Sequence, residues 1–173
     1  MIDVEHWLRA GGLAVLAIVV FAESGLLLGF FLPGDTLLFV AGFLSSAAGG
    51  HVLPPLAITA GVVFLSAASG DQVGYMIGRR GGPALLGRSK SRLFNPSNVE
   101  RAQKFFARRG SRAVVVARFV PVVRTFTPVV AGVAHMRYRT FVTYNVIGAL
   151  VWGVGIVSLG SLLGDALGRP LVL

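Results

Sequence analysis

Four ionisable residues stand in stretches that are apolar enough to enter a lipid bilayer. Arg118 and Arg124 lie in the run RFVPVVRTFTPVVAG, and Glu23 and Asp35 lie in the run ESGLLLGFFLPGDTLLFVAG. A charged side chain at the centre of a bilayer costs roughly 2.5 to 3.5 kcal/mol on insertion scales, so each of these residues needs a partner. One run is acidic and the other is basic. We therefore predict that the two runs pair with each other.

The two residue types bring different chemistry to such a pairing. An arginine guanidinium binds phosphate oxygens through two parallel hydrogen bonds and keeps its charge in practice. A carboxylate can be neutralised by a proton, so Glu23 and Asp35 are predicted to couple protons or act as counter-ions, and Arg118 and Arg124 to bind a lipid phosphate. Protonation of an acid would free an arginine for an anionic headgroup. The alternative is that the four residues form fixed salt bridges that only pin the two segments.

Both runs also contain proline, which interrupts a helix. A proline inside a helix removes a backbone donor and clashes with the preceding turn, so an unbroken helix through either run is costly. We predict that each run folds back as a re-entrant helical hairpin, with tips at Pro33-Gly34 and at Pro121. Irregular backbone at membrane depth is tolerated only where protein or water surrounds it. The matching positions are Phe31, Pro33, Asp35 and Ala41-Gly42 in the first run and Phe119, Pro121, Arg124 and Ala131-Gly132 in the second.

The composition indicates a membrane protein of one domain. Hydrophobic residues make up 54% of the 173 residues, against about 45 to 50% in ordinary soluble domains. The net charge of +9 comes mainly from the interval between Arg79 and Arg139, which holds fourteen of the sixteen basic residues. This distribution is typical of a cytoplasmic loop beside membrane spans. Nucleic-acid binding is not expected, because no groove-reading motif accompanies the charge.

The fold class predicted from these patterns is an all-α polytopic membrane protein. It is an inverted repeat of two re-entrant helical hairpins with adjacent spanning helices and one interfacial amphipathic helix. Since basic residues flank both ends of the second hairpin, it would enter from the cytoplasmic side and the first from outside, as in many secondary transporters. The predicted elements are a first helix at 8–22, hairpin 1 at 24–46, a spanning helix at 56–78, a cytoplasmic loop at 79–112 with the amphipathic helix at 96–109, hairpin 2 at 113–134, and a spanning helix at 139–164.

Three more polar residues are secondary site candidates. Asp71 and Tyr75 lie one turn apart beside a glycine-lined face of the first predicted span, and Asn145 is the strongly polar member of the second. Asp71 has a second interpretation, as a carboxylate at the membrane edge that is capped by Tyr75 or by a basic residue.

The sequence offers no enzyme site. Its three histidines are far apart, so no metal site is predicted. Cysteine is absent, which excludes a disulfide framework and a thiolate metal site. No catalytic residues and no cofactor are expected. The acidic N-terminus indicates that no signal peptide is cleaved and that the first helix is kept.

Four motifs resemble those of the DedA family of membrane proteins. They are ESGLLLGFFLPGDTLLFVAG, GDQVGYMIGRRGG, RFVPVVRTFTPVVAGVAHM and YRTFVTYNVIGALVWG, and together they cover nearly the whole chain. The resemblance implies a bacterial cytoplasmic-membrane protein with two opposed re-entrant hairpins, related to eukaryotic lipid scramblases. It places the important acids of the family on Glu23 and Asp35 and its arginines on Arg118 and Arg124. Relatives commonly carry a further spanning helix after the segment that matches Ser161 to Gly168, and the sequence leaves open whether this protein has that helix.

The resemblance implies a lipid flippase. Members have been assigned to returning undecaprenyl phosphate to the cytoplasmic face, or to moving phosphatidylethanolamine, with dependence on the proton gradient. The leading prediction is therefore a flippase for a phosphorylated lipid carrier, undecaprenyl phosphate, with membrane lipids and protons as partners and a homodimer as the expected oligomer. The alternatives are a phosphatidylethanolamine flippase or scramblase, a proton-coupled transporter of a small solute, and a scaffold for envelope assembly that transports nothing.

Overall fold

The computed structural model describes residues 4–25, 34–86, 104 and 112–168. Every regular element in these ranges is a helix, which confirms the all-α prediction for this part of the chain. Pro33 and the predicted amphipathic helix at 96–109, apart from Lys104, lie outside the described residues. The helices are α1 Val4–Gly25, α2 Gly34–Leu44, α3 Leu56–Leu86, α5 Arg112–Ala117, α6 Pro121–Val133, α7 Tyr138–Ala149, the π-helix η2 Leu150–Val154, and α8 Gly155–Gly168.

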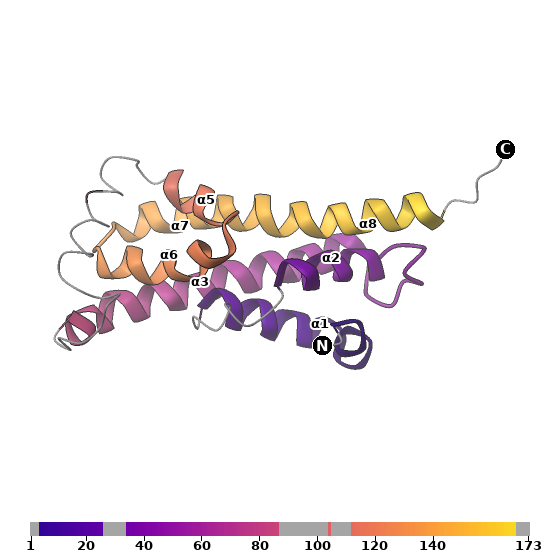
Figure 1. Cartoon of the computed structure of the whole chain (residues 1–173), viewed down its shortest axis with the longest axis horizontal. Helices are drawn as coiled ribbons and strands as arrows, with labels where there is room; N and C mark the ends of the chain where they lie inside the picture. Colours follow the sequence, from indigo (N-terminus) through magenta and orange to yellow (C-terminus); the bar gives the residue numbers. More distant parts are fainter. Residues whose placement is uncertain (1–3, 26–33, 87–103, 105–111, 169–173) are drawn as a thin grey trace.

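Two long helical rods run the length of the molecule in opposite directions (Figure 1). One rod is α3 and the other is the continuous series α7, η2 and α8. α1 and α2 approach the middle of the molecule from the end where α8 finishes, whereas α5 and α6 approach it from the opposite end. The middle of the molecule is therefore where the inner ends of four short helices come together.

The helix contacts repeat in a paired way. α1 packs on α3 and α2 packs on α8, while α5 packs on α7 and α6 packs on α3. The first half consists of α1, α2 and α3, and the second half of α5, α6 and the rod α7–η2–α8. In each half, the first short helix packs on the rod of its own half, and the second short helix packs on the rod of the other half. This exchange is the packing expected when two similar halves are related by an approximate twofold axis. Residues 26–33 of the predicted hairpin at 24–46 lie outside the described residues, and insertion of 24–46 and 113–134 into a bilayer as re-entrant hairpins stays a prediction.

Several element bounds differ from the predicted ones. α1 continues past residue 22 to Gly25 and is kinked at Gly12, which has φ 55° and ψ −140°. Its apolar part is the 15 residues Gly11–Gly25, which is short of the roughly 20 that a membrane span needs. The first span is longer than predicted, since α3 reaches Leu86 rather than residue 78.

The chain bends between α5 and α6, just before Pro121, but it does not bend sharply enough at Pro128 to end α6. α5 and α6 are separated by residues 118–120, and Pro121 is the first residue of α6, a position where its missing N–H is not needed. Pro128 lies inside α6 without ending it, although a proline within a helix is costly. A Cβ added at Gly74 of α3 would lie 3.2 Å from the Pro128 Cβ. Packing of α6 on α3 accommodates the proline there.

Glycines let α3 and α6 approach closely. A Cβ added at Gly78 would overlap the carbonyl oxygen of Val129, and a Cβ added at Gly132 would overlap the carbonyl oxygen of Tyr75. Gly78 therefore faces the carbonyl three residues before Gly132, and Gly132 faces the carbonyl three residues before Gly78. Because small residues allow backbones to come into contact, this is a typical helix–helix junction in membrane proteins.

The α2–α8 junction has the same construction. A Cβ at Gly42 would overlap the carbonyl oxygen of Val157, and a Cβ at Gly160 would overlap that of Phe39. The offset is again three residues on both helices. Gly42 and Gly132 are also the glycines that match in the two similar sequence runs, so the repeat seen in the sequence reappears as a repeated contact.

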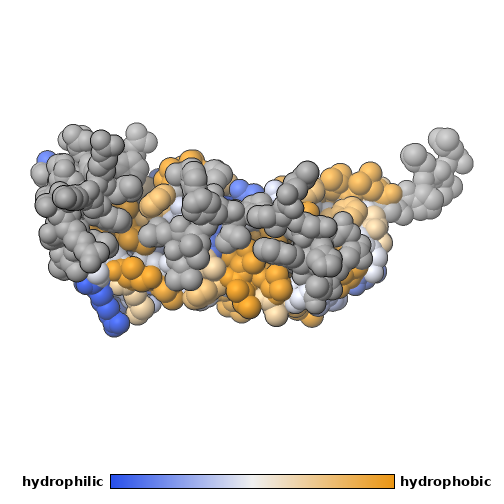
Figure 2. All heavy atoms as spheres, turned by 60° about the horizontal axis from the view of Figure 1, so that its bottom comes forward, coloured by the Kyte–Doolittle hydropathy of each residue, from blue (hydrophilic) through white to orange (hydrophobic). Residues whose placement is uncertain are grey.

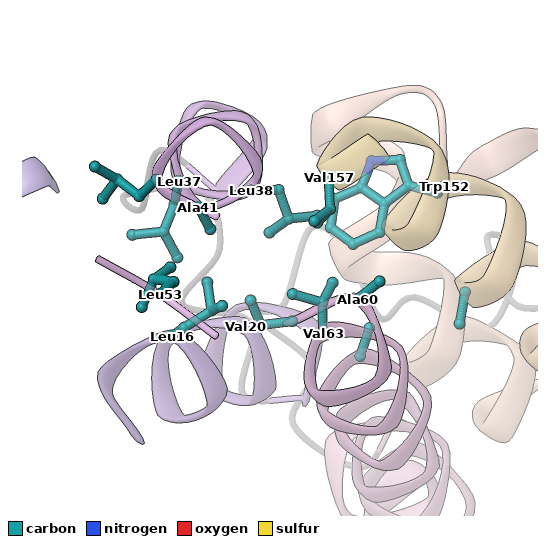
Figure 3. Close-up of a cluster of buried hydrophobic side chains, with 13 residues drawn as sticks. Leu16, Val20, Leu37, Leu38, Ala41, Leu53, Ala60, Val63, Trp152 and Val157 are labelled. Carbon is teal, nitrogen blue, oxygen red and sulfur yellow. The ribbon is translucent and has the colours of Figure 1, made fainter. Parts of the chain in front are cut away.

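Apolar side chains fill the space around these junctions. The larger cluster lies between α1, α2, α3 and the second rod, and Trp152 closes its edge (Figure 3). Fully buried members are Leu16, Val20, Leu37, Leu38, Ala41, Leu53, Val63 and Val157. This packing holds the inner ends of α1 and α2 beside η2.

The outer surface is also apolar, which is typical of a protein that sits in lipid. Large aliphatic side chains on three different helices are mostly exposed. In Figure 2, hydrophobic residues cover the middle of the molecule, and hydrophilic residues lie at the end where α3 finishes. Two stretches, Leu56–Gly81 and Tyr138–Leu167, are long and apolar enough to cross a membrane. The exposed residues include Ile18 at 66%, Leu65 at 64%, Leu159 at 61% and Leu167 at 68%.

We predict that Gly78→Ala destabilises the protein while Gly61→Ala does not. The added methyl at Gly78 must push α6 away from α3, whereas a Cβ at Gly61 meets no atom within 4 Å. Overpacking of this kind costs about 1 to 3 kcal/mol. Thermal unfolding of the two variants in detergent measures the difference, and equal melting temperatures would contradict the close α3–α6 contact.

Candidate functional site

Arg124 lies at the centre of the molecule and holds two carboxylates. Its Nη1 donates to Oδ1 of Asp35 at 2.6 Å, and its Nη2 donates to Oε1 of Glu23. These contacts join α6 to the last turn of α1 and the first turn of α2. The side chains of Arg124 and Glu23 are 10% and 3% exposed, while that of Asp35 is 44% exposed. The predicted pairing of the acidic and basic runs is thus present at Arg124, and one of its partners remains accessible.

Trp152 completes this group from the second rod. The Arg124 Cζ lies 4.5 Å from the centroid of the Trp152 ring, and the indole N–H donates to Oδ1 of Asp35 at 3.0 Å. A guanidinium at this distance is attracted by the ring electrons. Trp152 lies in the π-helix η2, and isolated π-turns within α-helices are frequent at functional sites. Trp152 is not among the site residues predicted from the sequence, although a buried indole N–H normally requires an acceptor and could have indicated it.

One oxygen of Glu23 is left without a partner. Oε2 is buried and has no hydrogen bond within the described part of the chain. It lies against Gly34, the first residue of α2, where any Cβ would overlap the carboxylate. Leaving a buried acceptor unsatisfied costs about 1 to 3 kcal/mol. Gly34 was predicted as a hairpin tip, and the structure adds that its missing side chain makes room for Glu23.

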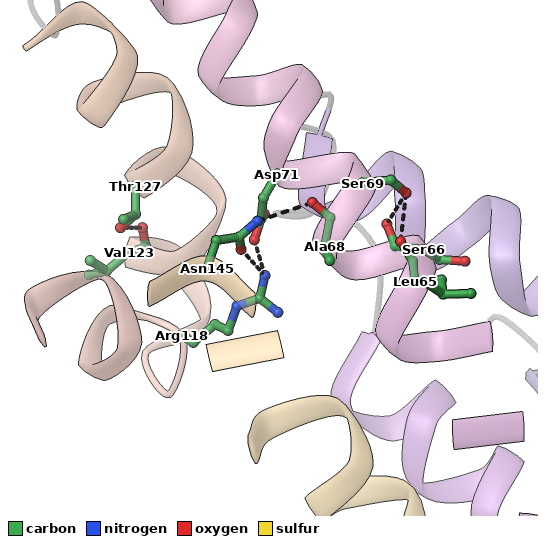
Figure 4. A network of polar contacts seen from close by, with 9 residues as sticks. All are labelled: Leu65, Ser66, Ala68, Ser69, Asp71, Arg118, Val123, Thr127 and Asn145. Carbon is green, nitrogen blue, oxygen red and sulfur yellow. Dashed lines mark hydrogen bonds and ion pairs between the residues drawn. The ribbon is translucent and has the colours of Figure 1, made fainter. Parts of the chain in front are cut away.

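Arg118 occupies a second, separate network (Figure 4). Its Nη2 donates to Oδ2 of Asp71 on α3 and, at 2.9 Å, to Oδ1 of Asn145 on α7. The amide of Asn145 in turn donates to the Ala68 carbonyl at 3.0 Å. A Cβ at Gly148 would lie 3.2 Å from Arg118 Cδ, so the glycine leaves space for this side chain. The network ties the two long rods together beside the inner end of α5.

These contacts correct one expectation and decide between two alternatives. Arg118 was expected to pair with Glu23 or Asp35, but its acidic partner in the described structure is Asp71. The partner of Asp71 is therefore a basic residue and not Tyr75, whose hydroxyl donates to the Met136 carbonyl at 2.5 Å. The sequence could not assign these partners because it shows which residues share a helix face and not which helix lies opposite.

The two networks are neighbours. The Arg118 Cζ lies 5.7 Å from the centroid of the same Trp152 ring that Arg124 contacts. Together they contain the carboxylates of Glu23, Asp35 and Asp71 and two guanidiniums. The group therefore carries one negative charge when every acid is ionised, and it is neutral when one acid holds a proton.

Comparison with known proteins identifies the family. The family model of the VTT domain matches residues 32–162. The chain is 43% identical to the protein DedA of Escherichia coli, over 80% of this chain and 63% of that protein. The chain belongs to the DedA family. An uncharacterized membrane protein of Mycobacterium tuberculosis is also 43% identical, over 95% of this chain and 74% of its own length, and one of Mycobacterium leprae is 38% identical over 93% and 70%. No solved structure gives a significant match.

Membership of the DedA family makes this chain a membrane protein and confirms the resemblance found in its motifs. The matched VTT domain contains every residue of both networks except Glu23, which precedes its first residue. Within the described residues, no group of three histidine, cysteine, aspartate or glutamate side chains is placed to hold a metal ion. The chemistry available to this DedA-family protein at its centre is thus that of two guanidiniums, three carboxylates, an amide and an indole.

We predict that the Arg118–Asp71 pair is strongly coupled in stability. Arg118→Met leaves Asp71 buried and uncompensated, and Asp71→Leu does the same to Arg118, so each should cost about 3 to 5 kcal/mol. The double variant replaces both charges with apolar groups and should recover most of that loss. Unfolding in detergent measures all three.

The matched control for this cycle is Arg112→Met, because Arg112 is exposed at the start of α5. Its stability should equal that of the native chain. Additive losses in the double variant would show that the two residues do not depend on each other.

Proposed function

We propose that this DedA-family protein is a lipid flippase that moves a phosphorylated lipid carrier, undecaprenyl phosphate, across the bacterial cytoplasmic membrane in a process linked to the proton gradient. The observation that carries the proposal is the arrangement at Arg124. A guanidinium that binds phosphate well is held in the middle of the molecule by carboxylates, one of which is 44% exposed.

The proposed mechanism is an exchange of partners on Arg124. With Asp35 and Glu23 ionised, the donors of Arg124 are directed at carboxylate oxygens. Protonation of Asp35 removes its charge and weakens its hold, which leaves Arg124 Nη1 for a phosphate oxygen. The phosphate oxygen then accepts from Nη1 in place of Asp35 Oδ1, while Nη2 stays on Glu23. Loss of the proton then restores the carboxylate and displaces the phosphate.

The surroundings of Arg124 suit a lipid better than a water-soluble ion. The π-helix of the second rod carries exposed aliphatic side chains, Leu150 and Val151, at 52% each. A polyprenyl tail can stay in the bilayer beside such a surface while only the headgroup passes the polar centre.

Arg118 has a different part in the proposal. Its side chain is 6% exposed and is held by both Asp71 and Asn145. We propose that Arg118 keeps the two rods in register and that Arg124 is the arginine that binds the phosphate. The packing exchange between the two halves supports the inverted repeat with a site at its centre, and the basic interval 79–112 is proposed to face the cytoplasm.

We predict that Arg124→Ala abolishes lipid movement in reconstituted vesicles while the protein still folds. Arg124→Lys keeps the charge but loses the planar fork, so the rate should fall roughly tenfold, since one charge-assisted hydrogen bond is worth about 1.5 to 3 kcal/mol. The measurement is the fraction of labelled undecaprenyl phosphate headgroups that become accessible from outside with time.

Three parallel samples decide between the functions. Vesicles with labelled phosphatidylethanolamine test the alternative lipid, and vesicle swelling in small solutes tests a solute transporter. Arg112→Ala removes an exposed arginine and should leave the rate unchanged. If no lipid moves with the native protein while a solute crosses, the flippase proposal is wrong; if nothing crosses, the scaffold alternative is favoured.

We further predict that the proton linkage resides in the two acids of Arg124. Asp35→Asn and Glu23→Gln keep the side-chain shape but cannot ionise, so lipid movement should no longer change when a pH gradient is imposed across the vesicle. Asp165→Asn is the matched control, because Asp165 is exposed near the end of α8. An unaltered gradient response in both acid variants would disprove the linkage.

A further inference from the structure

α3 finishes beside the junction of α6 with α7, at one end of the molecule (Figure 1). A cavity of about 580 Å³ opens between the last turns of α3 and the junction of α6 with α7. Its lining combines three basic side chains with two tyrosines and a methionine. The lining residues are Tyr75, Met76, Arg79, Arg80, His135 and Tyr138.

Within the described ranges, the positive charges of this cavity are not neutralised by neighbouring acids. In the ranges that the structure describes, neither Arg79 nor Arg80 contacts a carboxylate. Arg79 Nη1 donates instead to the Tyr75 hydroxyl at 3.1 Å and to the Met136 carbonyl at 3.4 Å. These neutral contacts orient the guanidinium along the cavity wall and leave its charge for an anion. Basic pockets between membrane helices on the cytoplasmic side are typical sites for anionic lipid headgroups.

The backbone conformation at His135 is an independent indication that this cavity binds a ligand. His135 has φ 55° and follows the last turn of α6. Its N–H bonds to the Gly132 carbonyl and the next N–H, of Met136, bonds to the Ala131 carbonyl, which is the helix-ending pattern that usually contains glycine at this position. A side chain at positive φ is strained. The strain places an imidazole in the cavity wall where glycine would be the easier choice.

The first turn of α7 adds further attraction for an anion. Tyr138 lines the cavity and is the first residue of α7, whose N-terminus has no side-chain cap. Free N–H groups and the helix dipole make such an end favourable for a phosphate. Basic side chains, a helix start and a tyrosine hydroxyl therefore converge on one space.

Two of the lining side chains suit a hydrocarbon chain. Met76 and Tyr138 are 45% and 49% exposed, and Ile77 beside them is 41% exposed. These side chains lie on the outer surface, where a membrane protein meets lipid. A site for free phosphate would instead be polar on every side.

We propose that this cavity binds the phosphate headgroup of a lipid, with Arg79, Arg80 and His135 on the phosphate and Met76 and Tyr138 against the tail. It is a binding site distinct from Arg124, at the basic end of the molecule. Its part in transport, as the place where the lipid docks before or after crossing, rests on the proposed function. Binding itself can be measured without transport.

The test is calorimetric titration of the purified protein in detergent with farnesyl phosphate, against farnesol and inorganic phosphate. The native protein should bind farnesyl phosphate and neither of the other two at the same concentration. Arg80→Ala removes an exposed charge, and His135→Gly removes the imidazole while relieving the strained backbone. Each should weaken binding roughly tenfold to a hundredfold, with His135→Gly at least as stable as the native chain.

Arg139→Ala is the matched control, because Arg139 is exposed on α7 but does not line the cavity. Unchanged affinity in both cavity variants would overturn the site. Equal binding of inorganic phosphate would make it a free-anion site, and equal binding of farnesol would make it an apolar groove; either would overturn the lipid-headgroup assignment. Because lipid movement is measured separately on Arg124 variants, failure here and failure of the proposed function are distinguishable.

Discussion

The structure depends on the fact that arginine cannot lose its charge. Two guanidiniums lie in the middle of an apolar protein, so the fold has to bring carboxylates to them from other helices. Arg124 draws in the inner ends of α1 and α2, and Arg118 draws in both long rods. An unpaired buried charge would cost several kcal/mol. The pairing therefore makes the arrangement of six helices mutually dependent, and it explains why the short helices end where they do.

Close backbone contact is what allows the charges to meet. In lipid there is no hydrophobic force between helices, so tight packing at small residues must hold them. The same reciprocal glycine contact joins α6 to α3 and α2 to α8. Each of these two short helices is thereby fixed to a rod of the opposite half, with its N-terminal turn at the centre. Asp35 and Arg124, which lie in these turns, are brought together by two copies of one packing solution.

The sequence predicted the helical class, the apolar spans and the pairing of an acidic with a basic run, because these follow from composition and from the cost of charge in lipid. It did not predict that Asp71 neutralises Arg118 or that Trp152 stacks on Arg124. Both contacts depend on which helix faces which, and a single chain pattern holds no such information. Pro128 shows the same limit, since packing against α3 permits a proline that local rules would exclude. The hairpin tip at Pro33 and the helix at 96–109 lie outside the described residues, so these stay predictions.

The two arginines differ in how accessible and how fully hydrogen-bonded their partners are, and this difference supports the separate roles that we propose for them. Arg118 has an acid and an amide as partners, is nearly inaccessible, and belongs to a chain of hydrogen bonds that ends on a backbone carbonyl. Arg124 has one accessible acid, Asp35, and one acid whose second oxygen, on Glu23, is unsatisfied. A fully satisfied network resists change, whereas a group with a spare acceptor and an exposed partner can take up a proton or exchange a ligand at little cost. With three carboxylates facing two guanidiniums, the excess negative charge is relieved by a single proton. The acids of Arg124 are where that proton is best accommodated, because protonating Asp71 would leave Arg118 buried without an anion.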